Sequence, residues 1–230
     1  EKVAAIGYTA VQVSGIGADI PHEAVKEICD ANGLTICITH VGFDYLQNDI
    51  DAAIAQHKLW DCPNVAVGSM PGPYREGGLE SFTQFAKDAT AVGKQLADAG
   101  LTFSYHNHSF EFVRFGDHTG LDVIYEESDP RYLQAEIDTY WVQHGGGDVR
   151  AWIKKVAGRM PVIHFKDMVM YEGRQTMAEI GEGNLNWPGI IEACEEAGVE
   201  WYAIEQDRCM RDPFDSLKIS YDNLRAMGVE

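Results

Sequence analysis

Positive charge is scarce in this chain of 230 residues. It has 18 lysine and arginine residues against 36 aspartate and glutamate residues, which gives a formal net charge of −18. Sequence-independent binding to nucleic acid and attraction to an anionic membrane both need a basic surface, so we expect neither partner. The chain also has no stretch that approaches the roughly 20 consecutive apolar residues of a membrane-spanning helix.

Cysteine is sparse, and its pattern argues against a disulfide framework. The five cysteines are an odd number and include no C-x-x-C pair, which favours reduced thiols in a cytoplasmic protein. No signal peptide is visible, but Glu1 to Ile6 have the pattern of a helix end that Gly7 closes. We therefore expect the natural chain to begin earlier, and this expectation leaves a targeting segment ahead of residue 1 open.

A unit of one strand and one helix repeats along the chain. Short apolar stretches without alternation predict parallel strands that are covered on both faces, and each is followed by a helical stretch. Strict alternation of strand and helix implies a parallel sheet. The seven predicted strands are residues 9–13, 34–39, 64–68, 101–105, 133–137, 161–165 and 201–204.

Two α/β architectures fit this alternation, an open doubly wound sheet and a closed (β/α)₈ barrel. The chain lacks the G-x-G-x-x-G and G-x-x-x-x-G-K-[ST] motifs that would support a nucleotide-binding open sheet. A barrel typically needs about 250 residues, and the shortfall of roughly 20 corresponds to one strand and most of one helix. We predict a single-domain TIM barrel over residues 1–230 that lacks its first strand and most of its first helix.

Polar residues gather where the predicted strands end, which is where a TIM barrel carries its chemistry. Four successive strands deliver Glu111, Asp138, His164 and Glu205 to one mouth. Three carboxylates and one imidazole form an oxygen-rich donor set that suits Mn²⁺ or Mg²⁺ better than a structural zinc ion. We therefore predict one divalent metal ion on these four ligands, with Mn²⁺ preferred and Mg²⁺, Co²⁺ or Zn²⁺ as alternatives.

Other polar residues at the same strand ends have less specific interpretations. His40 and His106 end two strands and are interpreted as pocket residues. Asp167 and Asp207 also follow strands, but helix capping or a loop ion pair would place an acid there equally well. Only the set of four therefore carries the metal prediction.

Five segments occur in an order and spacing that extend over the chain from Val3 onward. They are YHNHSFEF (Tyr105–Phe112), AEIDTYW (Ala135–Trp141), VIHFKDM (Val162–Met168), EIGEGNLNW (Glu179–Trp187) and WYAIEQD (Trp201–Asp207). Together they resemble the xylose-isomerase-like barrel superfamily of sugar isomerases and epimerases, which includes tagatose and psicose epimerases, inosose dehydratase and endonuclease IV. The resemblance implies the same barrel and the same four metal ligands.

The resemblance also implies roles for individual residues. Glu111 and Glu205 match two ligands that act as the acid–base pair in the epimerase branch, so they are the predicted catalytic residues. The positions that match substrate-facing residues are His40, His106, His108 and Lys166.

One position departs from the epimerase branch. That branch has a substrate-contacting histidine three residues after the metal-binding aspartate, where this chain has Trp141. The departure weakens a direct assignment as a ketose 3-epimerase, although Trp141 keeps the place of a substrate-binding residue. Endonuclease IV fits less well, because it holds three zinc ions on a larger ligand set and binds duplex DNA.

Isomerisation, epimerisation and elimination share a first step, the removal of a proton next to a carbonyl group. The resulting enediolate is stabilised by a divalent metal ion, and a carboxylate serves as the base. We predict a sugar isomerase or epimerase for a sugar, cyclitol or keto-sugar. The alternatives are a lyase that uses the same groups on an inosose or 3-keto-glycoside, and a non-catalytic sugar-binding barrel subunit. Homodimers and homotetramers, which are common in the family, are the expected assemblies.

Overall fold

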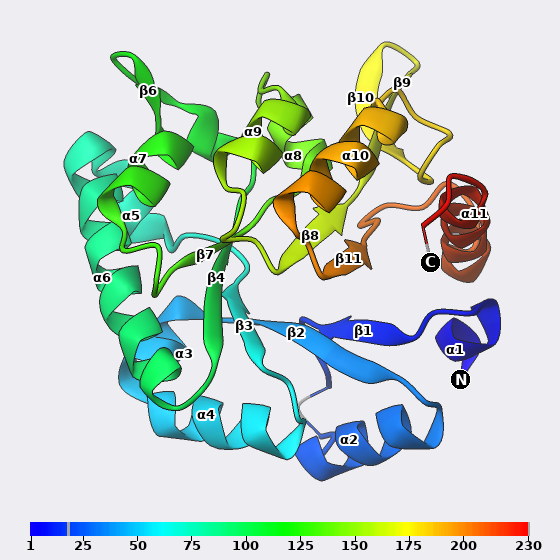
Figure 1. Cartoon of the computed structure of the whole chain (residues 1–230), viewed down its shortest axis with the longest axis horizontal. Helices are drawn as coiled ribbons and strands as arrows, with labels where there is room; N and C mark the ends of the chain where they lie inside the picture. The colour runs from blue at the N-terminus through cyan, green and yellow to red at the C-terminus, as the bar shows by residue number, and fades with distance from the viewer. Residues whose placement is uncertain (18, 230) are drawn as a thin grey trace.

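A barrel wall of parallel strands forms the centre of the molecule, and helices surround it (Figure 1). The computed structural model describes residues 1–17 and 19–229. Within these residues the wall has seven strands, which alternate with helices as the sequence predicts. They are β1 (Ala10–Val13), β2 (Thr35–Val41), β3 (Asn64–Val67), β4 (Thr102–His106), β7 (Gln134–Glu136), β8 (Val162–Phe165) and β11 (Trp201–Ile204).

An outer helix lies between each strand and the next along the chain, and a last one follows β11. This arrangement, together with the parallel pairing, confirms the predicted α/β barrel architecture. The outer helices are α2 (His22–Ala31), α4 (Ile50–Leu59), α6 (Gly78–Asp98), α7 (Gly120–Glu127), α9 (Val149–Lys155), α10 (Trp187–Ala197) and α11 (Pro213–Ala226).

The strands pair in chain order around the barrel. Strands β1, β2, β3, β4 and β7 form one sheet, and β8 pairs with β11. The two sheets meet at the ends of β7 and β8, where the amide of His164 donates to the carbonyl of Ile137 at 2.8 Å and Asp138 bridges to His164. The carboxyl ends of all these strands therefore lie on one side of the barrel.

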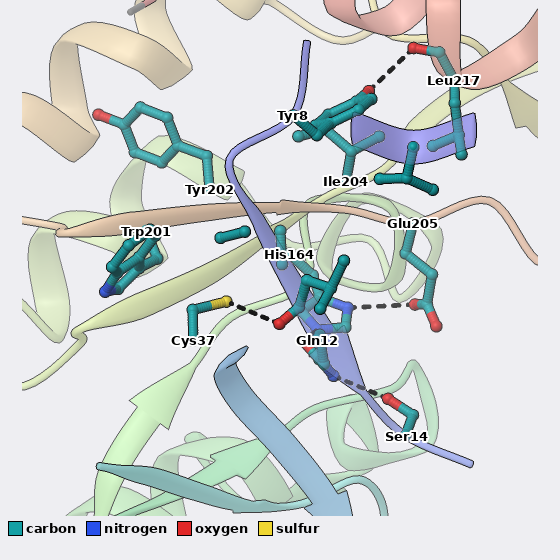
Figure 2. A pocket seen from close by; sticks show the side chains of 14 residues that line it. Tyr8, Gln12, Ser14, Cys37, His164, Trp201, Tyr202, Ile204, Glu205 and Leu217 are labelled. Atoms are coloured by element: carbon teal, nitrogen blue, oxygen red, sulfur yellow. Dashed lines mark hydrogen bonds and ion pairs between the residues drawn. The ribbon is translucent and has the colours of Figure 1, made fainter. Parts of the chain in front are cut away.

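The two ends of the wall, β11 and β1, are not hydrogen-bonded to each other in the described part of the chain. A cavity of about 230 Å³ lies between them, bordered by Gln12 on β1 and Ile204 on β11 (Figure 2). The hydroxyl of Tyr8 donates across this side of the molecule to the carbonyl of Leu217 at 2.9 Å. Helix α1 (Lys2–Ile6), which the sequence predicts, packs against α11 beside the cavity.

Burial explains why the strand sequences do not alternate. All four residues of β3 and all four of β8 are buried, because helices cover the outer face and the barrel interior covers the inner one. Aromatic side chains fill the space between wall and helices, and Phe85 of α6 packs edge-on against Tyr105 of β4. β1 and β11 are only half-buried, since each has one unpaired edge.

The loops after the strands contain short elements that the sequence does not predict. The helical ones have at most six residues, too few to show a helical period, and single side-chain caps define some of them, such as the carboxylate of Asp138 at the start of α8. These elements are α3 (Phe43–Asn48), α5 (Gly72–Glu76), the 3₁₀ turn η1 (Phe110–Phe112), β5 (Arg114–Phe115), β6 (His118–Thr119), α8 (Thr139–His144), β9 (Asp167–Tyr171) and β10 (Arg174–Ala178).

Two predicted absences can be compared with the structure. All five cysteines are free thiols, which agrees with the reduced thiols predicted from their odd number and the missing C-x-x-C pair. Among the residues that the structure describes, no helix has both the length and the apolar character needed to cross a bilayer.

Gly93 marks a close approach between α6 and the chain before β7. A Cβ atom at this position would lie 1.9 Å from the carbonyl oxygen of Tyr132, which is backbone and cannot turn away. We predict that Gly93→Ala lowers the free energy of unfolding by about 2 kcal/mol or more in chemical denaturation. Gln95→Ala on the exposed side of the same helix is the control and should change it by less than about 0.5 kcal/mol. Equal stability of the two variants would contradict this packing.

Candidate active site

A group of four side chains at the barrel mouth brings possible metal ligands together. The donor atoms of His106, Asp138, His164 and Glu205 all lie within 4.8 Å of one another. They come from the carboxyl ends of β4, β7, β8 and β11, so the barrel topology itself places them. Three of them are buried, while the side chain of Glu205 is 33% exposed and faces the cavity of Figure 2.

The spacing within the group suits a metal ion. His106 Nε2 lies 3.3 Å from Asp138 Oδ2, and His164 Nδ1 lies 3.1 Å from Glu205 Oε2 and 3.8 Å from Asp138 Oδ2. Donor atoms around an ion with bonds of about 2.1 Å are separated by about 3.4 Å in a tetrahedral site and about 3.0 Å in an octahedral one. Two imidazoles and two carboxylates also form a donor set that Mn²⁺, Co²⁺ and Zn²⁺ accept.

Hydrogen bonds turn one nitrogen of His106 toward this group. Its Nδ1 lies 3.0 Å from the carbonyl of Gly68, which can only accept a hydrogen. Burial lowers the pKa of His106, so the ring is neutral and has a single N–H. With that hydrogen on Nδ1, His106 Nε2 and Asp138 Oδ2 face each other as two lone-pair donors. A cation between them would stabilise this contact.

His164 is oriented in the same way, from the other side. Its Nε2 faces two oxygen acceptors, Gln12 Oε1 at 2.7 Å and Glu136 Oε1 at 3.0 Å, so this nitrogen keeps its hydrogen. Nδ1 is then the atom that faces Glu205 and Asp138. Burial alone would lower the pKa of His164, but the charges of Glu136 and Glu205 outweigh it and raise the pKa to about 10. The position between these carboxylates therefore attracts positive charge strongly.

Glu136 is the fully buried acid that supports two histidines. Its Oε2 lies 2.7 Å from His40 Nε2, and its Oε1 faces His164. The rings of His40 and His164 stack with centroids 5.2 Å apart and planes 10° apart. A Cβ atom on Gly68 would lie 2.7 Å from His40 Nδ1, so only glycine leaves room for this ring.

Lys166 supplies the compensating positive charge. Its ammonium lies 2.6 Å from Glu205 Oε2, 3.2 Å from Asp138 Oδ2 and 2.8 Å from Asp207 Oδ2. Burial alone would raise the pKa values of Asp138 and Glu205, but the charge of Lys166 helps to hold both below their usual range. Asp207 thus takes part in an ion pair; the sequence leaves open whether this residue caps a helix or forms a loop ion pair.

Glu111 is buried beside this group and does not belong to it in the described residues. Its Oε1 accepts from the hydroxyl of Tyr105 at 2.6 Å, and both oxygens accept from the amide of His108 at 3.0 Å. Burial raises the pKa of Glu111 to about 7 despite these hydrogen bonds. The ligand role of Glu111 therefore stays a prediction, while His106 occupies the fourth position of the observed group.

Aromatic rings line the mouth next to the donor group. The His108 ring lies 5.0 Å from that of His106 and 5.2 Å from that of Trp141, measured between centroids. Trp141 is half-buried, and the ammonium of Lys166 lies 5.5 Å from its ring centroid. The predicted substrate-facing residues His40, His106, His108, Lys166 and Trp141 are thus linked by contacts to one another or to the donor group.

Two residues of the site escape the sequence prediction. Glu136 and Gln12 hold His164, yet neither is in the predicted set. The spacing of Glu136 and Asp138 contains a usable signal, because residues two apart in a strand face the same side. Asp167, by contrast, is structural: its carboxylate accepts from the indole of Trp187 at 2.6 Å and from the amides of Gly181 and Gly183.

The model of one protein family, described as the xylose isomerase-like TIM barrel, matches residues 1–227. The chain belongs to this family. The resemblance that the sequence motifs indicate is thereby confirmed, and the fold is the one that this family description names.

Curated relatives of this xylose isomerase-like barrel include inosose dehydratases. The enzyme of Geobacillus thermodenitrificans is 24% identical over an alignment that covers 54% of this chain and 47% of the relative. For that of Mesomycoplasma hyopneumoniae the identity is 25%, with 64% and 55% covered. The chain spans about half the length of these curated relatives.

Solved structures with the same fold include sugar isomerases and epimerases. A sugar phosphate isomerase/epimerase from Parabacteroides distasonis superposes with a TM-score of 0.83 at 21% identity, covering 98% of this chain and 86% of that one. An L-ribulose 3-epimerase gives a TM-score of 0.70 at 16% identity, with 99% and 86% covered. At these sequence identities, the superpositions show only that these proteins and this chain have the same fold.

Asp138 offers a clean test of the donor group, because it has two separable functions. Its Oδ1 caps α8 by accepting from the amide of Trp141 at 2.9 Å, while Oδ2 faces the histidines and Lys166. Asparagine keeps the cap and removes the charge. We predict that Asp138→Asn keeps the cap of α8 and weakens Mn²⁺ binding in calorimetry by more than about 100-fold.

The matched control is Asp148→Asn. Asp148 caps α9 in the same way, by accepting from the amide of Ala151 at 3.1 Å, and it is exposed away from the donor group. This variant should bind Mn²⁺ as the wild type does. Unchanged Mn²⁺ affinity of Asp138→Asn would contradict the assignment of Asp138 as a ligand.

Proposed function

We propose that the protein is a divalent-metal-dependent sugar isomerase or epimerase that removes a proton from a carbon next to a carbonyl group. The observation that carries the proposal is the donor group of His106, Asp138, His164 and Glu205 at the barrel mouth. Family membership supports a sugar, cyclitol or keto-sugar as substrate. The ion, which we expect to be Mn²⁺, would supply a Lewis acid that stabilises negative charge on the substrate oxygens.

Glu205 is the group best placed to take the proton. It is the acid of the donor group with substantial exposure, at 33%, whereas Asp138 is fully buried. Its hydrogen bond with His164 and the charge of Lys166 hold the pKa of Glu205 well below its usual range against the effect of burial. It is therefore ionised at neutral pH, as a base must be at the start of the reaction.

Glu111 is proposed as the second proton-transfer group. A carboxyl group with a pKa raised by burial to about 7 can both give and take a proton at neutral pH. Tyr105 and the amide of His108 fix its orientation. A pair of carboxyl groups allows a proton to be removed by one and returned by the other, which epimerisation needs. Trp141 would face the substrate ring beside them.

Elimination of water from an inosose or of an aglycone from a 3-keto-glycoside is the second candidate. It uses the same proton abstraction, followed by loss of a leaving group from the next carbon. Two observations favour it: the curated relatives are inosose dehydratases, and Trp141 replaces the histidine of the epimerase branch. The two reactions differ in their products, since an isomer keeps its mass and elimination lowers it.

Incubation in D₂O tests the reaction and identifies its class. With Mn²⁺ and a panel of ketoses, inososes and 3-keto-glycosides, we expect one substrate to incorporate deuterium or to lose the mass of its leaving group. Glu205→Gln keeps the shape of the side chain and removes the base, so it should slow this reaction by about 10³-fold or more. Mass spectrometry follows both quantities.

Glu200→Gln is the control, because Glu200 precedes the opposite end of β11 and is exposed. It should leave the rate unchanged. Full activity of Glu205→Gln would remove Glu205 from the mechanism. If the wild type exchanges no compound of the panel and binds no divalent ion, the enzyme proposal fails and the non-catalytic sugar-binding alternative takes its place.

A further inference from the structure

The ammonium of Lys166 contacts the same carboxylate oxygens that serve as metal donors. It lies 2.6 Å from Glu205 Oε2 and 3.2 Å from Asp138 Oδ2, and both oxygens also face the ring of His164. We infer that Lys166 is an internal competitor of the metal ion, and that binding of the ion displaces its ammonium from these oxygens onto Asp207. The inference rests on the proposed metal-dependent function.

Burial makes the competition unavoidable. Lys166 is 1% exposed, so its charge has no access to bulk water and must stay next to a carboxylate. A divalent ion on Asp138 and Glu205 would place two like charges against the same pair of oxygens. Their repulsion is large in a buried site, where the effective dielectric constant is far below that of water.

Asp207 provides the alternative position. Its Oδ2 already lies 2.8 Å from the ammonium, and its side chain is 48% exposed, at the rim of the mouth. A small shift of the ammonium away from Glu205 and Asp138 therefore keeps a full ion pair. The shift is short, because the ammonium already forms a hydrogen bond with Asp207.

The displacement would couple metal binding to preparation of the substrate site. Once the ammonium has moved away, the lone pairs of Glu205 no longer accept hydrogen bonds from Lys166 and are available to the metal ion or to a substrate proton. In this structure the ammonium lies 5.5 Å from the centroid of the Trp141 ring, the predicted substrate-facing residue. Lys166 would thus be free to donate a hydrogen bond to a substrate oxygen only when the ion is bound. It would then act as a positioning residue whose location depends on metal binding.

Calorimetric binding of Mn²⁺ without substrate tests this competition. Lys166→Met keeps the length of the side chain and removes the charge, so it should tighten Mn²⁺ binding by about tenfold or more. Asp207→Asn removes the alternative position, so it should weaken binding by about fivefold or more. In the double variant Lys166→Met/Asp207→Asn, the second substitution should change Mn²⁺ affinity by less than about twofold. Without the lysine there is no ammonium for Asp207 to accept, so its charge no longer assists metal binding.

The double variant separates this role from general electrostatics. Loss of a nearby negative charge would weaken Mn²⁺ binding equally with or without Lys166, and that result would overturn the inference. Glu182→Gln is the control, since Glu182 is 42% exposed and pairs with Arg211 instead; it should bind Mn²⁺ normally. If Lys166→Met folds poorly, Asp207→Asn still allows the inference to be overturned, because unchanged or tighter Mn²⁺ binding of this variant contradicts the competition.

The outcomes also distinguish this inference from the proposed function. A wild type that binds no Mn²⁺ would remove both. A wild type that binds Mn²⁺ while Lys166→Met binds it no more tightly would remove the competition and leave the metal-dependent reaction standing.

Discussion

Mutual repulsion among buried carboxylates is the constraint on which the rest of the site depends. Glu136, the last residue of β7, and Asp138, two residues further along the chain, are fully buried, and Glu205 follows β11 beside Asp138. Uncompensated charges in such a place would cost several kcal/mol each. His164 and Lys166 lie between the acids and balance them. The arrangement thus creates a strong position for a cation, and the barrel supplies it by ending four strands at one mouth.

Most of the chain lies outside the site and holds the strand ends that carry the donor residues in position. The outer helices and the apolar strand faces hold the strand ends in register, and the half-buried edges of β1 and β11 flank a cavity that reaches His164 and Glu205. Gln12 crosses from β1 to His164, so the position of that strand bears directly on the orientation of a donor. The packing of the barrel wall therefore directly affects the orientation of a metal donor.

Much of the fold could be predicted from the sequence, because alternating strand and helix signals and glycine stops are local. The donor group could be predicted only in part from the sequence. Asp138, His164 and Glu205 follow from strand ends, but the choice between His106 and Glu111 depends on where each side chain turns. Tyr105 and the amide of His108 hold Glu111, and Gly68 turns His106 inward. These contacts join distant segments, which no spacing in the sequence reveals.

The proposed reaction requires that these donors hold one divalent ion. Crystals grown with Mn²⁺ and measured at the manganese absorption edge test it most directly. We predict one anomalous peak about 2.0–2.3 Å from His106 Nε2, Asp138 Oδ2, His164 Nδ1 and Glu205 Oε2. A peak on a different set of side chains, or no peak at this mouth at saturating Mn²⁺, would contradict this metal site.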